Sequence, residues 1–401
     1  MIPNQSDRSL IDSSKIDEFL NKEILSNLDQ YAKLAKSFTF AFPLNFENEV
    51  EELTLIGLIA LLDFGGQYDP VLYAQNSRSE FDTIRSLVFS LYLSSSSASL
   101  SSSSELSPKW LSTATPPSLA QHMRLSIVTE RPHPTLPGIT VGEQGGPVLG
   151  FVLDVAGRVN RAGSWLVSKG YKSIGEWIKE GVSTCGGDVD KFVQWVTAIQ
   201  GSKVLGDDGS ERADSEIMSY RQALRLALML GPKRFSSSGD PFQHVPAPPH
   251  DALATALVQL GIVEFGTVFG EGVGQIRKRL DEALSSATIP GSGDEEAQTK
   301  EQEKILVWVE VTPEEHAQLW AGSVLACLRM AERATVLEPE SEVTIITAAG
   351  LSAWFAARAE KGHHWTSSTI AAAGDRASDG DGDGDGRYPR IVVAIASPKE
   401  N

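Results

Sequence analysis

The chain has 401 residues with 41% apolar side chains, which is enough to bury the cores of two or three domain-sized units, or of one large domain with insertions. Its 35 Lys and Arg residues stand against 52 Asp and Glu, and the formal net charge of −17 disfavours direct binding to the phosphate backbone of a nucleic acid. Two cysteines are too few for a disulfide framework, and the sequence shows no signal peptide and no apolar run long enough to span a bilayer. We therefore expect a cytoplasmic or nuclear protein in solution, without a membrane partner.

Helical spacing of apolar residues recurs along most of the chain, with capping residues or prolines in front and glycines behind. Only Ile305–Val311 and Arg390–Ala396 have the character of strands. The sequence predicts a mainly helical fold in one large domain over 13–360, after a disordered N-terminus over 1–12 and before an acidic low-complexity tail over 361–401. Helices are expected over residues 16–34, 50–62, 80–92, 148–169, 215–230 and 250–261, and from 173, 188 and 312 onward.

One predicted helix, Val50–Leu62, differs from the others because it is apolar nearly all round. Such a helix is typically buried, and Gly65 and Gly66 indicate a tight turn after it. Asp63 and Phe64 then stand at its C-terminal end. An acidic residue at that end opposes the helix dipole, so Asp63 either faces solvent or has a specific partner.

Three segments lack the apolar residues that would offset the entropy cost of ordering them. They are the serine-rich stretch Ser94–Ser107, the polar linker Pro290–Lys304 and the tail Ala371–Arg387. We expect all three to be exposed and poorly ordered.

No metal or cofactor is expected. The sequence lacks a zinc motif, a paired CxxC, a Walker A loop and a GxSxG nucleophile elbow. Asp381, Asp383 and Asp385 match the first half of a calcium-binding EF-hand loop, but Val392 stands where the closing bidentate Glu is required. A solvated acidic tail is the preferred interpretation of this segment.

Four segments resemble, in their order and spacing, the eukaryotic queuosine salvage protein family. They are TFAFPLNFENEVEELTLIGLIALLDFGGQY from Thr39, GRVNRAGSWLVSKGYKSIGEWI from Gly157, MSYRQALRLALML from Met218 and HDALATALVQLGIVE from His250. The resemblance covers roughly residues 39–360 and identifies the chain as a divergent, fungal-type member.

The resemblance implies a helical fold similar to that of the helix-hairpin-helix DNA glycosylases. It also implies that a monomer hydrolyses a small nucleotide, queuosine 5'-phosphate, to queuine and ribose 5-phosphate. An oxocarbenium-like transition state requires an ionised carboxylate, the base requires stacking and polar contacts, and the phosphate requires a cation. The resemblance assigns catalysis to Asp251 and His250 and substrate binding to Asp63, Phe64, Tyr68, Tyr220 and Arg221.

Each of these residues also has a structural interpretation. Asp251 is suited to capping its helix, Phe64 and Tyr68 are suited to a core, and Arg221 is suited to a solvated helix face. The family's acid falls at His250, one residue before Asp251.

Other acidic positions of the family are apolar in this chain, near Leu325 and Leu328. A catalytically degenerate binding or scaffold protein of the same fold is therefore the alternative, and a glycosylase acting on DNA is a third. An enzyme should bring Asp63, Arg221 and Asp251 around one cleft with aromatic walls.

Overall fold

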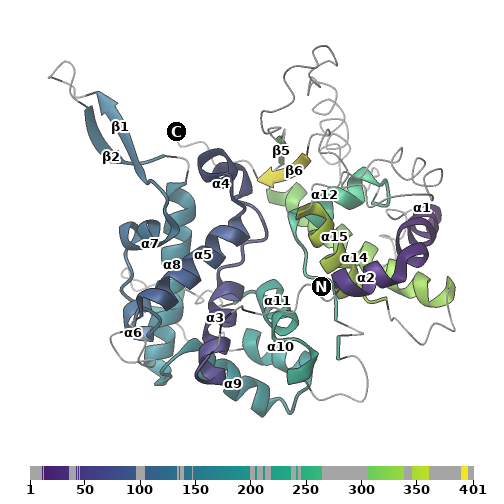
Figure 1. Ribbon diagram of the computed structural model, residues 1–401, viewed down its shortest axis with the longest axis horizontal. Helices are drawn as coiled ribbons and strands as arrows, with labels where there is room; N and C mark the ends of the chain where they lie inside the picture. The colour runs from purple at the N-terminus through teal and green to yellow at the C-terminus, as the bar shows by residue number, and fades with distance from the viewer. Residues whose placement is uncertain are drawn as a thin grey trace. The chain divides into compact units, whose positions relative to one another are not determined.

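A computed structural model shows that the chain is mainly helical, as the sequence predicts (Figure 1). The strands of the described residues form three sheets of two strands each. Within the same residues, no helix combines the length and the apolar character needed to cross a membrane. The structure describes residues 11, 13–35, 42, 44, 46–95, 104–132, 135, 140–146, 148–198, 204–205, 211–212, 218–235, 241–242, 245–263, 306–311, 313–337, 346–360 and 390–395.

The chain divides into two compact units. Unit 1 comprises residues 1–37 and 243–401, and unit 2 comprises residues 38–242. The chain therefore begins in unit 1, builds unit 2 and then returns to unit 1. A single domain over 13–360 stays a prediction.

Unit 2 is built mainly from helices, with two short hairpins of strands. Its elements are α3 (Glu49–Leu61), α4 (Asp69–Asn76), α5 (Glu80–Ser94), α6 (Pro108–Leu111), α7 (Pro116–Met123), β1 (Val128–Pro132), β2 (Thr140–Gln144), α8 (Leu149–Lys169), α9 (Ile174–Thr184), α10 (Val189–Ala198), β3 (Val204–Leu205), β4 (Glu211–Arg212), α11 (Tyr220–Leu230) and the 3-10 turn η5 (Pro232–Arg234).

Helix α3 is the buried helix that the sequence predicts, and it packs against α5, α9 and α11. The side chain of Asn48 caps it by accepting a hydrogen bond from the N–H of Glu51. Helix α9 approaches α3 closely at Gly175, where a Cβ atom would lie 2.2 Å from the carbonyl oxygen of Val50. The lack of a side chain at Gly175 thus sets the distance between these helices.

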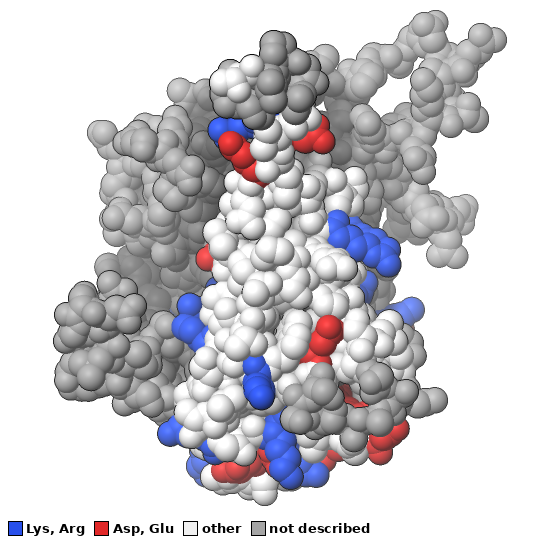
Figure 2. Space-filling model, turned by 90° about the vertical axis from the view of Figure 1, so that its left-hand side faces the viewer, with Lys and Arg blue, Asp and Glu red and all other residues white. Residues whose placement is uncertain are grey.

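The antiparallel hairpin β1–β2 extends from one end of unit 2, with Val128 opposite Gln144 and Pro132 opposite Thr140 (Figure 1). All residues of β2 are exposed. Figure 2 shows this side of the unit: most of the described surface is uncharged, with charged side chains at the hairpin, at the opposite end and scattered between them.

Two boundaries in unit 2 differ from the predicted ones. The prediction that the serine-rich stretch is exposed is wrong for its last residues, because Ser104, Leu106 and Ser107 are buried. Ser107 also caps α6, since its side chain accepts a hydrogen bond from the N–H of Trp110. Helix α11 begins at Tyr220 rather than near residue 215, because Ser219 and Gln222 form a reciprocal capping box.

Unit 1 combines helices from both ends of the chain with one pair of strands. Its elements are α1 (Ser13–Phe19), the π turn η2 (Leu20–Ile24), the 3-10 turn η3 (Leu25–Asn27), α2 (Leu28–Ala35), α12 (Asp251–Gln259), β5 (Leu306–Val311), α14 (Pro313–Leu337), α15 (Ala348–Glu360) and β6 (Arg390–Ile395). Strands β5 and β6 pair in parallel, and both were predicted as strands.

The first predicted helix of unit 1 is interrupted by a π turn and a 3-10 turn. Leu20, Ile24 and Leu28 are four residues apart, which exceeds the α-helical period of about 3.6 residues. The wider π turn leaves both Leu20 and Ile24 fully buried. One face of this segment contributes to the core of unit 1, while Asn21, Lys22 and Ser26 on the other face are exposed, so the segment is amphipathic.

The core of unit 1 joins the N-terminal helices to α12, α14 and α15. Phe19 stacks on Phe355 at 5.4 Å between ring centroids and meets the edge of Trp354 at 5.6 Å. Arg358 forms an ion pair with Glu23 at 2.9 Å beside these rings. The predicted loose segments 290–304 and 371–387 and the acidic EF-hand-like tail before Arg390 lie outside the described residues.

Candidate functional site

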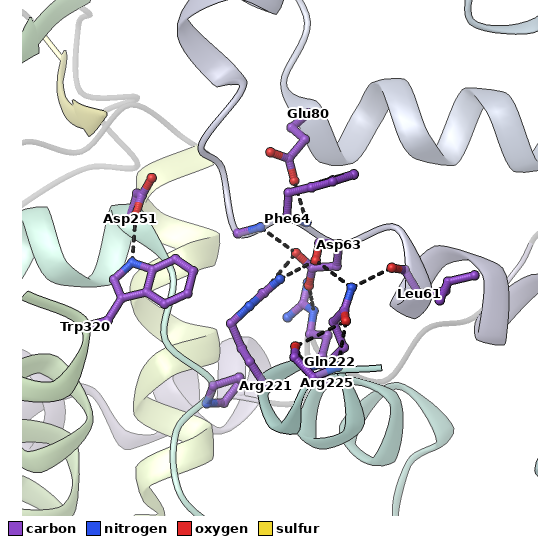
Figure 3. A network of polar contacts seen from close by, with 12 residues as sticks. Leu61, Asp63, Phe64, Glu80, Arg221, Gln222, Arg225, Asp251 and Trp320 are labelled. Carbon is purple, nitrogen blue, oxygen red and sulfur yellow. Dashed lines mark hydrogen bonds and ion pairs between the residues drawn. The ribbon is translucent and has the colours of Figure 1, made fainter. Parts of the chain in front are cut away.

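The turn that follows α3 carries three of the predicted binding residues, Asp63, Phe64 and Tyr68. Gly65 and Gly66 adopt positive φ angles of 85° and 99°, a conformation that side chains with a Cβ disfavour. The N–H of Gly65 donates to Oδ1 of Asp63 at 2.9 Å. This hydrogen bond folds the turn back on the carboxylate (Figure 3).

Asp63 is buried, and two arginines of α11 neutralise it. Nη1 of Arg221 lies 3.1 Å from Oδ1 of Asp63, and Nε of Arg225 lies 3.3 Å from Oδ2. Arg221 and Arg225 are four residues apart, so they project from one face of the helix. Burial alone would raise the pKa of Asp63, but the two positive charges, with hydrogen bonds from Arg221 and Gly65, lower it below its usual value.

The C-terminal carbonyls of α3 receive their hydrogen bonds from side chains of α8 and α11. Gln222 and Arg158 both donate to the carbonyl oxygens of Leu61 and Asp63, and Arg221 donates to that of Asp63. Arginines at this position are also favoured by the helix dipole. They resolve the apparent conflict of an acidic residue at the end of a buried helix.

Glu80, the first residue of α5, fixes the same turn from the other side. Its side chain accepts hydrogen bonds from the N–H groups of Phe64 at 2.8 Å and Tyr68 at 3.2 Å, while its own N–H donates to Asp69 at 2.6 Å. Burial and the nearby carboxylates of Asp69 and Asp63 raise the pKa of Glu80 to about 8. Asp63 and Glu80 are therefore neighbouring carboxyl groups whose pKa values are shifted in opposite directions.

The aromatic residues of the turn pack together beside a cation. Phe64 is buried and meets the edges of Tyr68 and Phe151, and the guanidinium of Arg158 lies 3.7 Å from the centroid of its ring. The hydroxyl of Tyr68 donates a hydrogen bond to the exposed carboxylate of Asp154. Burial and this contact raise the pKa of Tyr68. Tyr68 is half-buried, so it links the buried turn with the surface of unit 2.

His250 and Asp251 belong to unit 1, at the start of α12. Nδ1 of His250 accepts a hydrogen bond from the N–H of Leu253 at 3.1 Å, and Nε2 donates to the carbonyl oxygen of Ser352 at 3.3 Å. This pattern assigns the ring proton to Nε2. The interpretation of Asp251 as the helix cap is wrong, because the ring of His250 accepts the capping hydrogen bond.

Asp251 is the first residue of α12 and is buried, with 2% of its surface exposed. Its Oδ1 accepts a hydrogen bond from Nε1 of Trp320 on α14 at 2.7 Å (Figure 3). The N-terminal dipole of α12 also favours a negative charge at this position. Asp251 is thus a buried carboxylate that helix α14 holds in place.

The structure brings together four of the predicted residues, Asp63, Phe64, Tyr68 and Arg221, within unit 2. Tyr220 begins the same helix as Arg221, but 55% of its surface is exposed. The predicted cleft around Asp63, Arg221 and Asp251 stays a prediction.

Sequence reasoning missed three members of the Asp63 cluster, namely Glu80, Arg158 and Arg225. Arg225 could have been found from its four-residue spacing to Arg221, and Arg158 lies in a segment that resembles the family. Glu80 gave no signal beyond its place at a helix start. Among the described residues no group of three His, Cys, Asp or Glu side chains is arranged to hold a metal ion.

The Asp63 cluster can bind an anion or support proton transfer. Two guanidinium groups pair with one ionised carboxylate, a third, that of Arg158, binds the backbone carbonyl of the same residue, and a second carboxyl group with a raised pKa lies nearby. Pairs of carboxyl groups with opposite pKa shifts are typical of acid–base sites, although buried ion pairs also produce such shifts. Comparisons with models of protein families and with curated proteins find no match for this chain.

Proposed function

We propose that this protein hydrolyses the N-glycosidic bond of queuosine 5'-phosphate and releases queuine, which can then be salvaged into tRNA. The observation that carries the proposal is the convergence of Asp63, Phe64, Tyr68 and Arg221 in one cluster of unit 2. These residues come from two segments that resemble the queuosine salvage family, 158 positions apart at the Asp63–Arg221 contact. The identity of the substrate is inferred from the resemblance in sequence.

The proposed roles follow from the chemistry of each side chain. Phe64 and Tyr68 offer aromatic surface for the 7-deazaguanine, and Asp63 offers a negative charge to the base or its cationic side arm. Arg221 binds the 5'-phosphate, for which it exchanges part of its pairing with Asp63. A guanidinium binds phosphate through two parallel hydrogen bonds, which suits this exchange.

Asp251 is the proposed catalytic carboxylate. In hydrolysis, water adds to C1' of the ribose, the C–N bond breaks, and the departing base takes a proton as water loses one. An ionised carboxylate near the sugar stabilises the positive charge of the transition state and accepts the proton of the water. His250 is proposed to orient it. Both ring nitrogens of His250 have protein partners, so a direct proton transfer by this residue requires one of those contacts to break.

The proposal also covers the oligomeric state, the location and the fold type of the protein. We expect it to act as a monomer on a small nucleotide in the cytoplasm, without direct contact to nucleic acid. We also propose that its helices have the arrangement found in the helix-hairpin-helix DNA glycosylases.

The test is incubation of the purified protein with queuosine 5'-phosphate and detection of free queuine by liquid chromatography and mass spectrometry. Turnover should fall about a hundredfold or more in Asp251→Asn, which keeps the shape of the side chain but removes its charge. Asp82→Asn is the matched control, because Asp82 is a solvent-facing acid in the first turn of α5. A folded wild-type protein that releases no queuine would contradict the proposal.

A non-catalytic binding or scaffold protein is the second candidate, and one observation favours it. Asp63 forms ion pairs with both Arg221 and Arg225, as it would in a purely structural network. A scaffold of this kind predicts no turnover in the wild type and no effect of Tyr68→Leu on nucleotide binding. The enzyme predicts that the same variant raises KM, because the stacking surface is lost.

A further inference from the structure

A second group of polar side chains lies in unit 2, outside the cluster around Asp63. Ser90 of α5 and His122 of α7 are joined by a hydrogen bond of 2.9 Å between Oγ and Nδ1. Nε2 of the same ring lies 3.5 Å from Oε2 of Glu105. The three residues come from separate segments of the chain. The imidazole of His122 lies between the hydroxyl of Ser90 and the carboxylate of Glu105, which is the arrangement of nucleophile, base and carboxylate in a catalytic triad.

We propose that Ser90, His122 and Glu105 form a second catalytic site, which transfers acyl groups from carboxylic esters. A serine hydroxyl becomes a nucleophile when a neighbouring imidazole accepts its proton, and a carboxylate on the other ring nitrogen fixes the tautomer. Triads of this kind are defined by geometry rather than by a sequence motif. The absence of a GxSxG elbow from the sequence is therefore compatible with the site.

A helix end and a carboxylate lie beside the ring of His122. His122 stands in the last turn of α7, where the helix dipole stabilises a cation. Oε2 of Glu105 is buried and makes no hydrogen bond to any described residue, and it lies within ion-pair distance of Nε2 of His122. The ring of Trp110 meets His122 edge-on at 6.2 Å between centroids.

The three side chains are each partly exposed. Ser90 is half-buried, and the side chains of His122 and Glu105 are 15% and 27% exposed. Helix α7 lies on the side of unit 2 whose surface is mainly uncharged (Figure 2). An uncharged ester suits this surface better than an ionic substrate.

The reaction proceeds in two balanced steps. Oγ of Ser90 adds to the ester carbonyl while its proton passes to Nδ1 of His122, and the ester C–O bond then breaks as His122 returns the proton to the leaving alcohol. Water repeats the sequence on the acyl-serine, which releases the carboxylic acid and restores Ser90. The N–H of Ser90 lies within α5 and is used by the helix, so it cannot stabilise the oxyanion. We therefore expect slow turnover, with an acyl-serine that accumulates when an activated ester with a good leaving group makes acylation faster than deacylation.

The test is covalent labelling of the full-length protein with a fluorophosphonate probe, in which the serine Oγ bonds to phosphorus and fluoride departs. The labelled serine is then mapped by mass spectrometry. Label should appear on Ser90 and vanish in Ser90→Ala. The rate should fall by about 10³-fold in His122→Ala and by about tenfold or more in Glu105→Gln. The wild type should also release a burst of p-nitrophenol from p-nitrophenyl acetate, and the burst rate should decrease across the variants in the same order as the labelling rate.

Ser86→Ala is the matched control, because Ser86 is a half-buried serine one turn earlier on α5 and should leave the labelling unchanged. Melting curves identify any variant that unfolds, and His122→Gln, which keeps a polar side chain but removes the base, replaces His122→Ala if that variant does. The proposal is overturned if Ser90 is not labelled, or if it is labelled equally fast without the imidazole. Queuine release should persist in Ser90→Ala, so this result is independent of the glycosidase proposal.

Discussion

Asp63 and Asp251 are both buried aspartates at helix ends, but the protein supports their charges in different ways. Asp63 follows the C-terminus of α3, where the dipole is unfavourable, and Arg221 and Arg225 compensate with full positive charges. Asp251 stands at the N-terminus of α12, where the dipole is favourable, and it accepts a hydrogen bond from the indole of Trp320. The first carboxylate is held by charge, and the second by helix position and a neutral donor.

The difference has a functional consequence. A carboxylate paired with two arginines has much of its charge neutralised, and is better suited to positioning than to stabilising a cationic transition state. A carboxylate supported by a neutral donor retains more of its field for a substrate. This contrast supports the assignment of binding to Asp63 and of catalysis to Asp251.

The largest effect is expected for Asp63→Ala. Removing this carboxylate leaves Arg221 and Arg225 partly buried without their counter-ion, which should lower the free energy of unfolding by about 3–5 kcal/mol. Urea unfolding followed by circular dichroism measures the change. Glu143→Ala is the control, because its pair with Arg131 is exposed and should not matter measurably. If both substitutions lowered the free energy of unfolding equally, the ion pairs of Asp63 would not stabilise the protein more than an exposed pair does.

The next effect concerns pH and Glu80. Because its pKa is raised to about 8 in the folded protein, Glu80 stabilises the fold fully below its unfolded pKa of about 4.3, and this contribution is lost as the pH rises through 8. Asp63 behaves oppositely: its pKa is lowered, so its contribution is present above about 3.9 and is lost as the pH falls through its folded pKa. Between the two pKa values of Glu80, the free energy of unfolding should fall by an amount on the order of a few kcal/mol.

Glu80→Gln provides the measurement for this pH dependence. The amide cannot ionise, so the decline in melting temperature between pH 5 and 8 should flatten, while the acid limb controlled by Asp63 should remain. The amide NH2 also accepts no hydrogen bond, so the N–H of Phe64 or Tyr68 loses its partner, and a lower overall stability is expected. An unchanged slope would show that Glu80 does not titrate in this range.

A smaller effect is expected for the contact between Asp251 and Trp320. Trp320→Phe removes the indole donor at 2.7 Å from the buried carboxylate and should cost about 1–3 kcal/mol of unfolding free energy. Asp251→Ala with Trp320→Phe completes a double-mutant cycle, and a coupling energy of at least about 0.5 kcal/mol is expected for residues in contact. Additive effects would mean that the hydrogen bond contributes nothing to stability.

Much of the fold could be predicted because it depends on local patterns. The continuous apolar surface of α3, the helix start at Ser173 and the β-branched run of β5 are all visible in the sequence. Helical content requires only such short-range information. The π turn at Leu20–Ile24 was not predicted, since it depends on packing against the rest of unit 1.

The candidate site was less predictable because its contacts are long-range. Asp63 was singled out by its unfavourable position on the dipole, but its pairing with Arg221 lies 158 residues away along the chain. Glu80 has the sequence environment of an ordinary helix start, and its raised pKa arises only once the turn and Asp69 surround it. The choice of His250 over Asp251 as the cap depends on a ring tautomer, which Ser352 fixes from a distant helix.

The smallest effect is expected at His250, and it separates capping from catalysis at the start of α12. His250→Ala removes the acceptor for the N–H of Leu253 and should cost about 1 kcal/mol of stability, whereas His250→Asn supplies a replacement acceptor and should restore most of it. If His250 only caps the helix, queuine release should recover in the Asn variant together with the melting temperature. If it orients Asp251 for catalysis, stability should recover while turnover stays low, because Asn cannot reproduce both ring contacts. Turnover that follows the melting temperature through all three proteins would assign His250 to the fold and leave Asp251 as the sole catalytic residue of this helix start.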